Sequence, residues 1–208
     1  LKMDRKKFIQ SLIGTSAFLA IPYDSYSVAD SIKRLIQDTA RPTKGSLIGF
    51  KTDPIKKVRV GIIGLGNRGS VLLEMFQWLA ENNACEIVAL ADLHASRVEK
   101  ATQKLKKWQQ PVPKKYSGGE NEWKKLAQQD DIDLILITTP WALHTPMCIY
   151  GMNAGKHVAS EVPIAYSLSD CWDLIETAEK TQKHCIMVEN CCYNEEELFV
   201  LNMIENGV

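Results

Sequence analysis

The stretch Val58-Arg-Val-Gly-Ile-Ile-Gly-Leu-Gly-Asn-Arg-Gly69 decides the fold, because an apolar run ends in glycines spaced G-x-G-x-x-G and a helix-like pattern follows. This arrangement predicts the first strand and turn of a dinucleotide-binding fold. Gly64 would make the tight turn, Gly66 would let the backbone approach a pyrophosphate, and Gly69 would let the new helix lie close to the strand. The N–H groups at the start of that helix would face the phosphates.

A second apolar run, Cys85-Glu-Ile-Val-Ala-Leu-Ala-Asp92, follows the expected helix Ser70–Glu81 and ends in an acid. An aspartate about 20 residues beyond the glycines can accept hydrogen bonds from both ribose hydroxyls of the adenosine half, and its charge would repel a 2′-phosphate. No arginine adjoins Asp92 in the sequence to reverse this preference, so we predict NAD as the cofactor over NADP. The alternative is that Asp92 merely caps the helix that begins near Ala95.

Composition describes an ordinary globular protein of one or two domains, because the 208 residues carry a formal net charge of zero and are 45% hydrophobic. Nothing in this balance indicates nucleic-acid binding. Six cysteines show no C-x-x-C pair and no metal-ligand spacing with histidine, so we predict neither a metal site nor a disulfide framework.

The N-terminal 29 residues resemble a secretory signal. Basic residues in Asp4–Gln10 precede the uncharged apolar stretch Phe8–Ile21, which is too short to span a membrane comfortably, and Ser27-Val-Ala29 offers small residues for cleavage. The run Arg5-Lys6-Lys7-Phe8-Ile9 is also similar to a twin-arginine export signal in which lysine replaces the second arginine. We therefore expect export to the periplasm or cell envelope and a mature chain without a stable membrane span. The alternative is an amphipathic helix packed on the domain.

Residues 30–56 have the composition of an irregular leader, with a helical turn expected only at Ile32–Gln37. Beyond them, residues 57–208 alternate between strand and helix patterns. This alternation predicts an α/β fold, a Rossmann-type doubly wound parallel sheet covered on both faces. After Asp92 the expected elements are the helices Ala95–Gln110, Glu122–Gln129, Ser169–Gln182 and Glu195–Glu205, and the strands around Tyr116 and at Ile132–Ile137, Lys156–Ser160 and His184–Val188.

Side chains that follow the carboxyl ends of these strands would face the ligand, since parallel sheets of this kind bind at that edge. They are Thr139, Pro140, Trp141 and His144 after one strand, Glu161 after the next and Asn190 after the last. A nicotinamide nucleotide would pass along them.

Three motifs together are similar to the nucleotide domain of the Gfo/Idh/MocA oxidoreductases over roughly residues 57–208. They are Gly64–Gly69, Thr139-Pro-x-x-x-His144 and Ala154-Gly-Lys-His-Val-Ala-Ser-Glu161. In relatives an α+β domain follows and supplies the substrate pocket. The resemblance thus identifies the chain as an N-terminal fragment with the C-terminal α+β substrate domain missing. We expect such a fragment to have little catalytic activity. We also expect it to expose apolar surface, which could lead to a homo-oligomer.

The residue at position 162 distinguishes between groups within this superfamily. Most sugar dehydrogenases of this superfamily carry Glu-Lys-Pro, whose lysine assists proton transfer, whereas Val162 stands at that position and cannot carry a proton. The chain is similar instead to the family 109 glycoside hydrolases, which are bacterial NAD-dependent α-N-acetylgalactosaminidases. The segments that carry this similarity are Asn67-Arg68, Thr139-Pro-Trp141, Glu161-Val-Pro163, Cys171-Trp172, Glu179–Cys185, Glu189–Tyr193 and Leu201-Asn-Met203.

This resemblance implies a redox route to hydrolysis of a glycan or small glycoside, in place of two carboxylates flanking the bond. The sugar's C3 hydroxyl is oxidised by NAD⁺, the C2 proton becomes acidic, the aglycone leaves C1 by elimination, water adds and the hydride returns. The implied cofactor contacts are Asn67, Arg68, Asp92, Trp141, Ala142, Leu143, His144, Glu161, Val162 and Asn190.

Other roles stay open for several of these residues. Tyr193 would be a catalytic proton donor or acceptor, or a buried structural tyrosine. Trp141 could pack in the core, His144 could bond backbone at a helix start, and Glu161 could only order its turn. A conventional sugar dehydrogenase and a non-catalytic nucleotide-binding remnant are the alternative functions.

Overall fold

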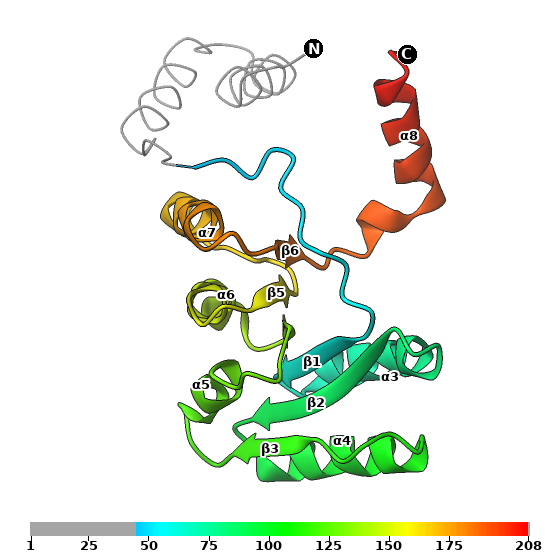
Figure 1. The fold of residues 1–208 in the computed structure, drawn as a ribbon, viewed down its shortest axis with the longest axis vertical. Coiled ribbons are helices and arrows are strands. Elements are labelled where there is room, and N and C mark those ends of the chain that lie inside the picture. Colours follow the sequence, from blue (N-terminus) through cyan, green and yellow to red (C-terminus); the bar gives the residue numbers. More distant parts are fainter. Residues whose placement is uncertain (1–44, 208) are drawn as a thin grey trace, which may run out of the picture. The chain divides into compact units, whose positions relative to one another are not determined.

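A parallel sheet forms the centre of the domain in the computed structural model, which describes residues 45–207 apart from the side chain of Tyr193 (Figure 1). Within that range six strands lie in the order β3-β2-β1-β4-β5-β6. They are β1 (Val58–Ile63), β2 (Cys85–Asp92), β3 (Lys114–Ser117), β4 (Leu134–Ile137), β5 (His157–Ser160) and β6 (Cys185–Met187). The chain crosses from one half of the sheet to the other after β3, so that β4 pairs with β1 and the strand order reverses between these two strands. This arrangement confirms the doubly wound Rossmann-type fold.

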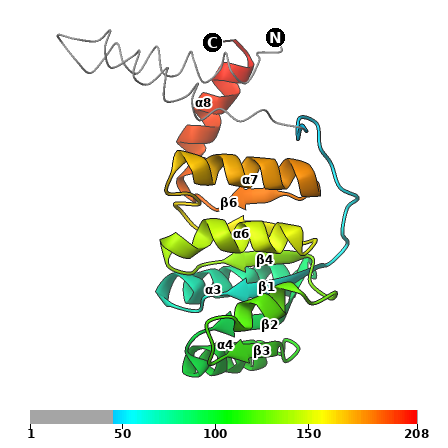
Figure 2. The ribbon, with the colours of Figure 1, turned by 90° about the vertical axis from the view of Figure 1, so that its left-hand side faces the viewer.

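Helices cover both faces of this sheet, as Figures 1 and 2 show. On one face lie α3 (Asn67–Glu81) and α4 (Ala95–Lys107); on the other lie α5 (Glu122–Ala127), α6 (His144–Asn153) and α7 (Leu168–Thr181). Two 3₁₀ turns, Trp141–Leu143 and Cys191–Tyr193, precede α6 and α8 (Glu195–Glu205). None of the described residues of α8 is buried.

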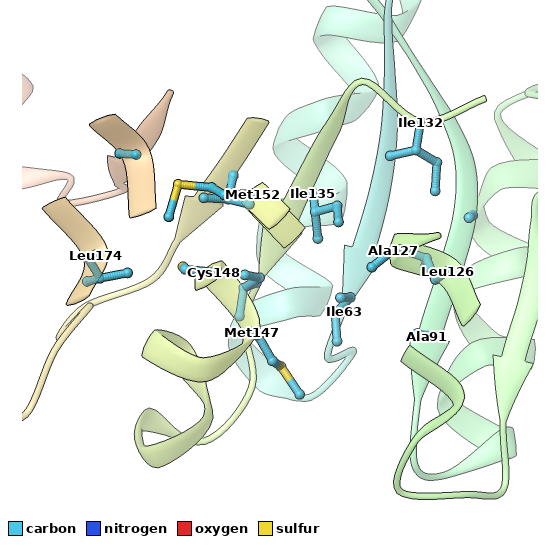
Figure 3. Packing of buried hydrophobic residues seen from close by; sticks show 14 residues of the cluster. Ile63, Ala91, Leu126, Ala127, Ile132, Ile135, Met147, Cys148, Met152 and Leu174 are labelled. Carbon is cyan, nitrogen blue, oxygen red and sulfur yellow. The ribbon is translucent and has the colours of Figure 1, made fainter. Parts of the chain in front are cut away.

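Two apolar clusters hold the helices on the sheet because successive side chains of a strand point to opposite faces. In β1, Ile62 belongs to the cluster beneath α3 and α4, and Ile63 to the cluster beneath α5, α6 and α7. In β4, Leu136 belongs to the cluster beneath α3 and α4, and Ile135 to the cluster beneath α5, α6 and α7. Figure 3 shows the second cluster, where side chains from the helices meet those of the strands. Each such fully buried side chain contributes about 1.5–3 kcal/mol.

Most differences from the predicted elements are shifts of one to three residues at their ends. The largest shift of a helix start is in α3, which begins at Asn67 and not at Ser70, because Gly66 serves as its N-cap. Helix α4 ends at Lys107, not Gln110, since Gln109 adopts a left-handed conformation with φ 57°. Strand β4 likewise starts at Leu134, and α8 has the predicted bounds.

The leader predicted at residues 30–56 is described only from residue 45 onward, and that part contains neither helix nor strand. Leu47 nevertheless packs against the second apolar cluster, and the Phe50 ring lies 4.7 Å from that of His184. The signal-like segment 1–29 and the helical turn at Ile32–Gln37 lie outside the described residues. Within the described part, no helix is long and apolar enough to cross a membrane.

A bidentate ion pair ties β1 to the segment that enters β4, at the edge opposite the carboxyl ends. Arg59 donates from Nε and Nη2 to the two carboxylate oxygens of Asp133 at 2.9 and 2.6 Å, and its backbone N–H donates at 2.9 Å. These hydrogen bonds hold the pKa of Asp133 below its ordinary value of 3.8. A lowered pKa stabilises the fold above the ordinary value, and this stabilisation is lost as the pH falls through the folded value.

We predict that Asp133→Asn lowers the free energy of unfolding by about 1.5–3 kcal/mol at neutral pH, the scale of hydrogen bonds to a charged group. The difference from the wild type should shrink as the pH falls below 3.8. Denaturant titrations over a pH series would measure both effects. Asp131→Asn is the matched control, because Asp131 pairs with Lys114 at an exposed site and such pairs contribute about 0–1 kcal/mol. Equal losses in the two variants would contradict the prediction.

Candidate dinucleotide site

The turn after β1 has the geometry that its glycines predict. Gly64 has φ +93°, and a Cβ there would lie 2.8 Å from the carbonyl carbon and oxygen of Thr138. At Gly69 a Cβ would overlap the carbonyl oxygen of Gly64. Gly66 differs from both, because the nearest atom to its Cβ position is Arg97 Nη1 at 3.9 Å. Gly64 and Gly69 are therefore required by the fold, whereas Gly66 leaves space in front of the backbone.

A cleft of about 770 Å³ opens at this turn, along the carboxyl ends of β1, β2 and β4. Its volume lies within the range of small-molecule sites. From the predicted site residues it brings together Gly64, Gly66, Asp92, Thr139, Pro140 and Leu143. The opposite wall comes from residues 119–124, which end the connection after β3 and begin α5, and which the sequence does not single out as site residues. Strand β3, with Tyr116, also lines the cleft.

Asp92 holds the glycine turn against the end of β2. Its Oδ2 accepts the Leu65 N–H at 2.7 Å, its Oδ1 accepts the His94 N–H at 2.8 Å, and its side chain is only 5% exposed. The alternative that Asp92 merely caps the next helix is wrong, since the N-cap of α4 is His94. An arginine does lie beside Asp92 in the structure, although it is five positions away in the sequence: Arg97 Nη1 is 3.6 Å from Asp92 Oδ1.

A second buried carboxylate joins the glycine turn to the end of β5. Arg68 Nε donates to Glu161 Oε1 at 2.6 Å, and the Glu161 side chain is 9% exposed. The other oxygen, Oε2, accepts the Val162 N–H at 3.3 Å. Glu161 thus orders its turn and also fixes the first turn of α3, while its predicted contact with a cofactor stays a prediction.

His144 connects the turn after β4 with the turn after β5. Its ring is fully buried, with Nδ1 2.8 Å from the Pro163 carbonyl oxygen and Nε2 2.8 Å from the Thr139 carbonyl oxygen. Carbonyl oxygens only accept, so a neutral ring satisfies one of them and a doubly protonated ring satisfies both. This geometry agrees with the backbone-bonding alternative, and any cofactor contact would have to come from the backbone of His144.

The remaining predicted residues lie along the same edge but outside the lining of the cleft. Trp141 is 58% exposed and its ring centroid lies 6.2 Å from that of Tyr166, so the core-packing alternative is wrong. Asn190 is exposed just after β6 and its amide points to the Cys191 sulfur. Asn67 and Ala142 are also exposed, in α3 and in the 3₁₀ turn. Tyr193 follows, and its side chain lies outside the described residues.

Metal and disulfide chemistry receive no support from the described part of the chain. All six cysteines are free, and no group of three or more His, Cys, Asp or Glu side chains among residues 45–207 could hold a metal ion. A hydrogen bond with Cys185, together with burial, raises the pKa of the Cys148 thiol. Cys148 and Cys185 pack in the second apolar cluster, and no cysteine lines the cleft.

The glycine turn, the acid at the end of β2 and the cleft at the change of strand order define a dinucleotide-binding Rossmann domain. The sequence profile of the Gfo/Idh/MocA family, described as an oxidoreductase family with an NAD-binding Rossmann fold, matches residues 58–189. The chain belongs to this family, and its cofactor is NAD. The open space at Gly66 and the buried Asp92 fit that cofactor.

Individual relatives indicate a narrower group. The chain is 42% identical over 167 residues to an alpha-N-acetylgalactosaminidase of Bacteroides fragilis, and 42% identical over 169 residues to one of Shewanella oneidensis. These matches cover 80% and 81% of the chain but only 38% and 36% of the relatives. The structure of the WlbA dehydrogenase of Chromobacterium violaceum, solved with NADH and UDP-GlcNAcA, has a similar fold, with a TM-score of 0.64 at 21% identity. The superposed region covers 75% of this chain and 42% of the WlbA chain.

Two glycine variants should separate folding from cofactor binding. Gly69→Ala should lower the free energy of unfolding by about 1–3 kcal/mol or more, because the new Cβ overlaps backbone. Gly66→Ala has room for its methyl group, so stability should change by less than about 1 kcal/mol, while the methyl group occupies space needed by the pyrophosphate and weakens NAD⁺ binding at least roughly tenfold. Thermal unfolding and calorimetric titration would measure the two effects. A Gly66→Ala variant that binds NAD⁺ like the wild type would contradict the assigned path of the pyrophosphate.

Proposed function

We propose that the chain is the NAD-binding domain of a glycoside hydrolase that releases terminal α-linked N-acetylgalactosamine. The observation that carries this proposal is the 42% identity to the alpha-N-acetylgalactosaminidase of Bacteroides fragilis over 80% of the chain. Since the chain spans 38% of that relative's length, the activity proposed is that of a protein containing a substrate domain as well.

The described residues support a division of tasks along the cleft. The glycine turn and the start of α3 would bind the pyrophosphate, and Asp92 would accept hydrogen bonds from the adenosine ribose. Thr139, Pro140 and Leu143 line the continuation of the cleft, toward the end of β5. When bound there, NAD supplies a reversible hydride acceptor for the C3 carbon of the sugar.

Val162 favours the hydrolase over a conventional sugar dehydrogenase. It stands after the buried Glu161, where sugar dehydrogenases of the superfamily carry a lysine that assists proton transfer. A valine side chain can neither donate nor accept a proton. The dehydrogenase reaction would have to take its general base from elsewhere, so net oxidation of free sugars is the second candidate function and a non-catalytic remnant is the third.

Fusion to the downstream domain of the Bacteroides fragilis relative should create an enzyme that hydrolyses a chromogenic α-N-acetylgalactosaminide in the presence of NAD⁺. The chain alone should release no chromophore, because elimination requires the C3 hydroxyl and a base to be positioned together. Absorbance would follow the chromophore and NADH in the same assay. Gly66→Ala in the fusion is the matched control and should lower turnover when NAD⁺ is supplied near the Kd of the unsubstituted fusion.

Two outcomes of this assay would contradict the proposal, the first its need for a substrate domain and the second the hydrolase reaction. Hydrolysis by the chain alone would show that a downstream substrate domain is not needed. Accumulation of NADH by a soluble fusion, without release of the chromophore, would favour the dehydrogenase instead.

We also propose that residues 1–29 are an export signal, on the basis of the basic and apolar stretches that precede Ser27-Val-Ala29. Protein recovered from the periplasm or cell envelope of the native host should begin near residue 30, as measured by mass spectrometry of its N-terminal peptide. Cytosolic protein that retains residues 1–29 would contradict the proposal.

Self-association of the chain is a further proposal, supported by the apolar side chains that α8 exposes. They are Leu198, Phe199, Val200, Leu201 and Ile204. Their contiguous exposure on one helix is typical of a surface that a partner covers.

A further inference from the structure

Residues 45–56, called the strap below, pack on the domain through Leu47 and through the ring of His184. Leu47 contacts the second apolar cluster, and its carbonyl oxygen accepts the Phe50 N–H at 3.0 Å. The Phe50 ring then lies 4.7 Å from the His184 ring, and Thr52 Oγ1 lies 3.4 Å from His184 Nε2. The second half of the strap therefore depends on where His184 is held.

His157 holds the backbone of His184 in place. The two residues lie at the amino ends of β5 and β6, and His157 Nδ1 accepts the His184 N–H at 3.0 Å. The His184 carbonyl oxygen accepts the Val158 N–H at 2.9 Å, so residue 184 is bonded to β5 through both of its backbone groups. A ring nitrogen that accepts a hydrogen bond carries no proton, so the His157 ring is neutral and its proton is on Nε2.

Protonation of His157 is incompatible with this arrangement. Because Nε2 already carries the ring proton, a second proton must be added at Nδ1. That proton would point at the His184 N–H, and a contact between two donors would replace the hydrogen bond. The backbone of residue 184 would then keep only its bond to Val158.

The surroundings of His157 favour its neutral form. Burial, then the positive charge of Lys183 and the neighbouring His184 ring, hold the pKa of His157 below its ordinary value of 6.5. Lys183 and His184 come from the segment before β6, and Asp133, from the segment before β4, acts in the opposite direction. The strap side chains at this place, Phe50 and Thr52, are uncharged.

The sign of the pH dependence follows from this lowered pKa. With His157 held in place, the chain binds fewer protons than it does once the ring is released to solvent. The bonded arrangement is therefore favoured above pH 6.5, and its advantage is lost as the pH falls from 6.5 through the lowered value. Histidine is the side chain whose ordinary pKa places its change of charge between about pH 5 and about pH 8.

We propose that His157 is a pH-sensitive latch for the strap. The neutral ring fixes His184 and thereby the contacts of Phe50 and Thr52; the protonated ring releases the His184 backbone, and those contacts are lost. Leu47 stays packed in its cluster. The latch lies at the edge of the sheet opposite the cleft, and no strap residue lines the cleft, so the proposal does not rest on the proposed function.

Nuclear magnetic resonance of the 208-residue chain between about pH 8 and about pH 5 tests the latch. The amide signals of Phe50, Thr52 and His184 should shift together with a midpoint below pH 6.5, and the nuclear Overhauser effect between the Phe50 and His184 rings should be lost at the acidic end. His157→Asn should abolish this transition, because asparagine Oδ1 can accept the His184 N–H and does not take up a proton. His94→Asn is the matched control, since His94 is an exposed histidine outside the strap, and it should leave the transition unchanged.

The tautomer of His157 keeps the test decisive if His157→Asn fails to fold. Imidazole nitrogen shifts of the wild type at about pH 8 should show the proton on Nε2. A proton on Nδ1 would overturn the latch. So would a transition that survives His157→Asn, which would assign it to another group such as the His184 ring, or strap signals that stay unchanged while His157 titrates.

Discussion

The hydrogen bonds that hold the turn at Gly64 are the constraint on which the rest of the site depends. The Gly64 N–H donates to the Ala91 carbonyl at 2.8 Å, and the Thr138 hydroxyl donates to the Gly64 carbonyl at 2.5 Å. Asp92 accepts the next N–H, that of Leu65. The turn is thereby bonded to the ends of β2 and β4 at once, so α3 begins in one position and its N-terminal N–H groups face the cleft.

The two carboxylates of the site, Asp92 and Glu161, therefore hold the local backbone in place as well as lying where a cofactor is expected to bind. Asp92 joins the turn to β2, and Glu161 joins the first turn of α3 to the end of β5 through Arg68. Each is almost fully buried and each has its oxygens occupied by protein donors. Such fully satisfied groups keep a single conformation, which is what a site that positions a dinucleotide along three strand ends requires.

Much of the fold and of the candidate site could be predicted from local sequence. The remaining features of the site depend on contacts between residues that are not neighbours in the sequence. The tight turn at Gly64, the close helix–strand approach at Gly69 and the alternation of strands and helices follow from short-range rules, and the structure confirms them. The role of Gly66 toward a pyrophosphate stays a prediction. Arg97 was missed because the prediction considered only direct neighbours of Asp92, although a position in the first turn of the next helix brings it back to the acid. The ion pair between Arg68 and Glu161 joins residues 93 positions apart. His144 was expected to face the cofactor, yet its ring points into the protein because two carbonyls at turn positions need a donor there.

The central claim, that NAD⁺ lies across the glycine turn and along the ends of β4 and β5, is tested most directly by hydrogen–deuterium exchange measured with and without NAD⁺. The account predicts slower exchange for the backbone amides of residues 64–70 and of residues 139–144, with β6 and α8 unchanged. Unchanged exchange in the glycine turn at saturating NAD⁺, or protection confined to α8, would contradict it.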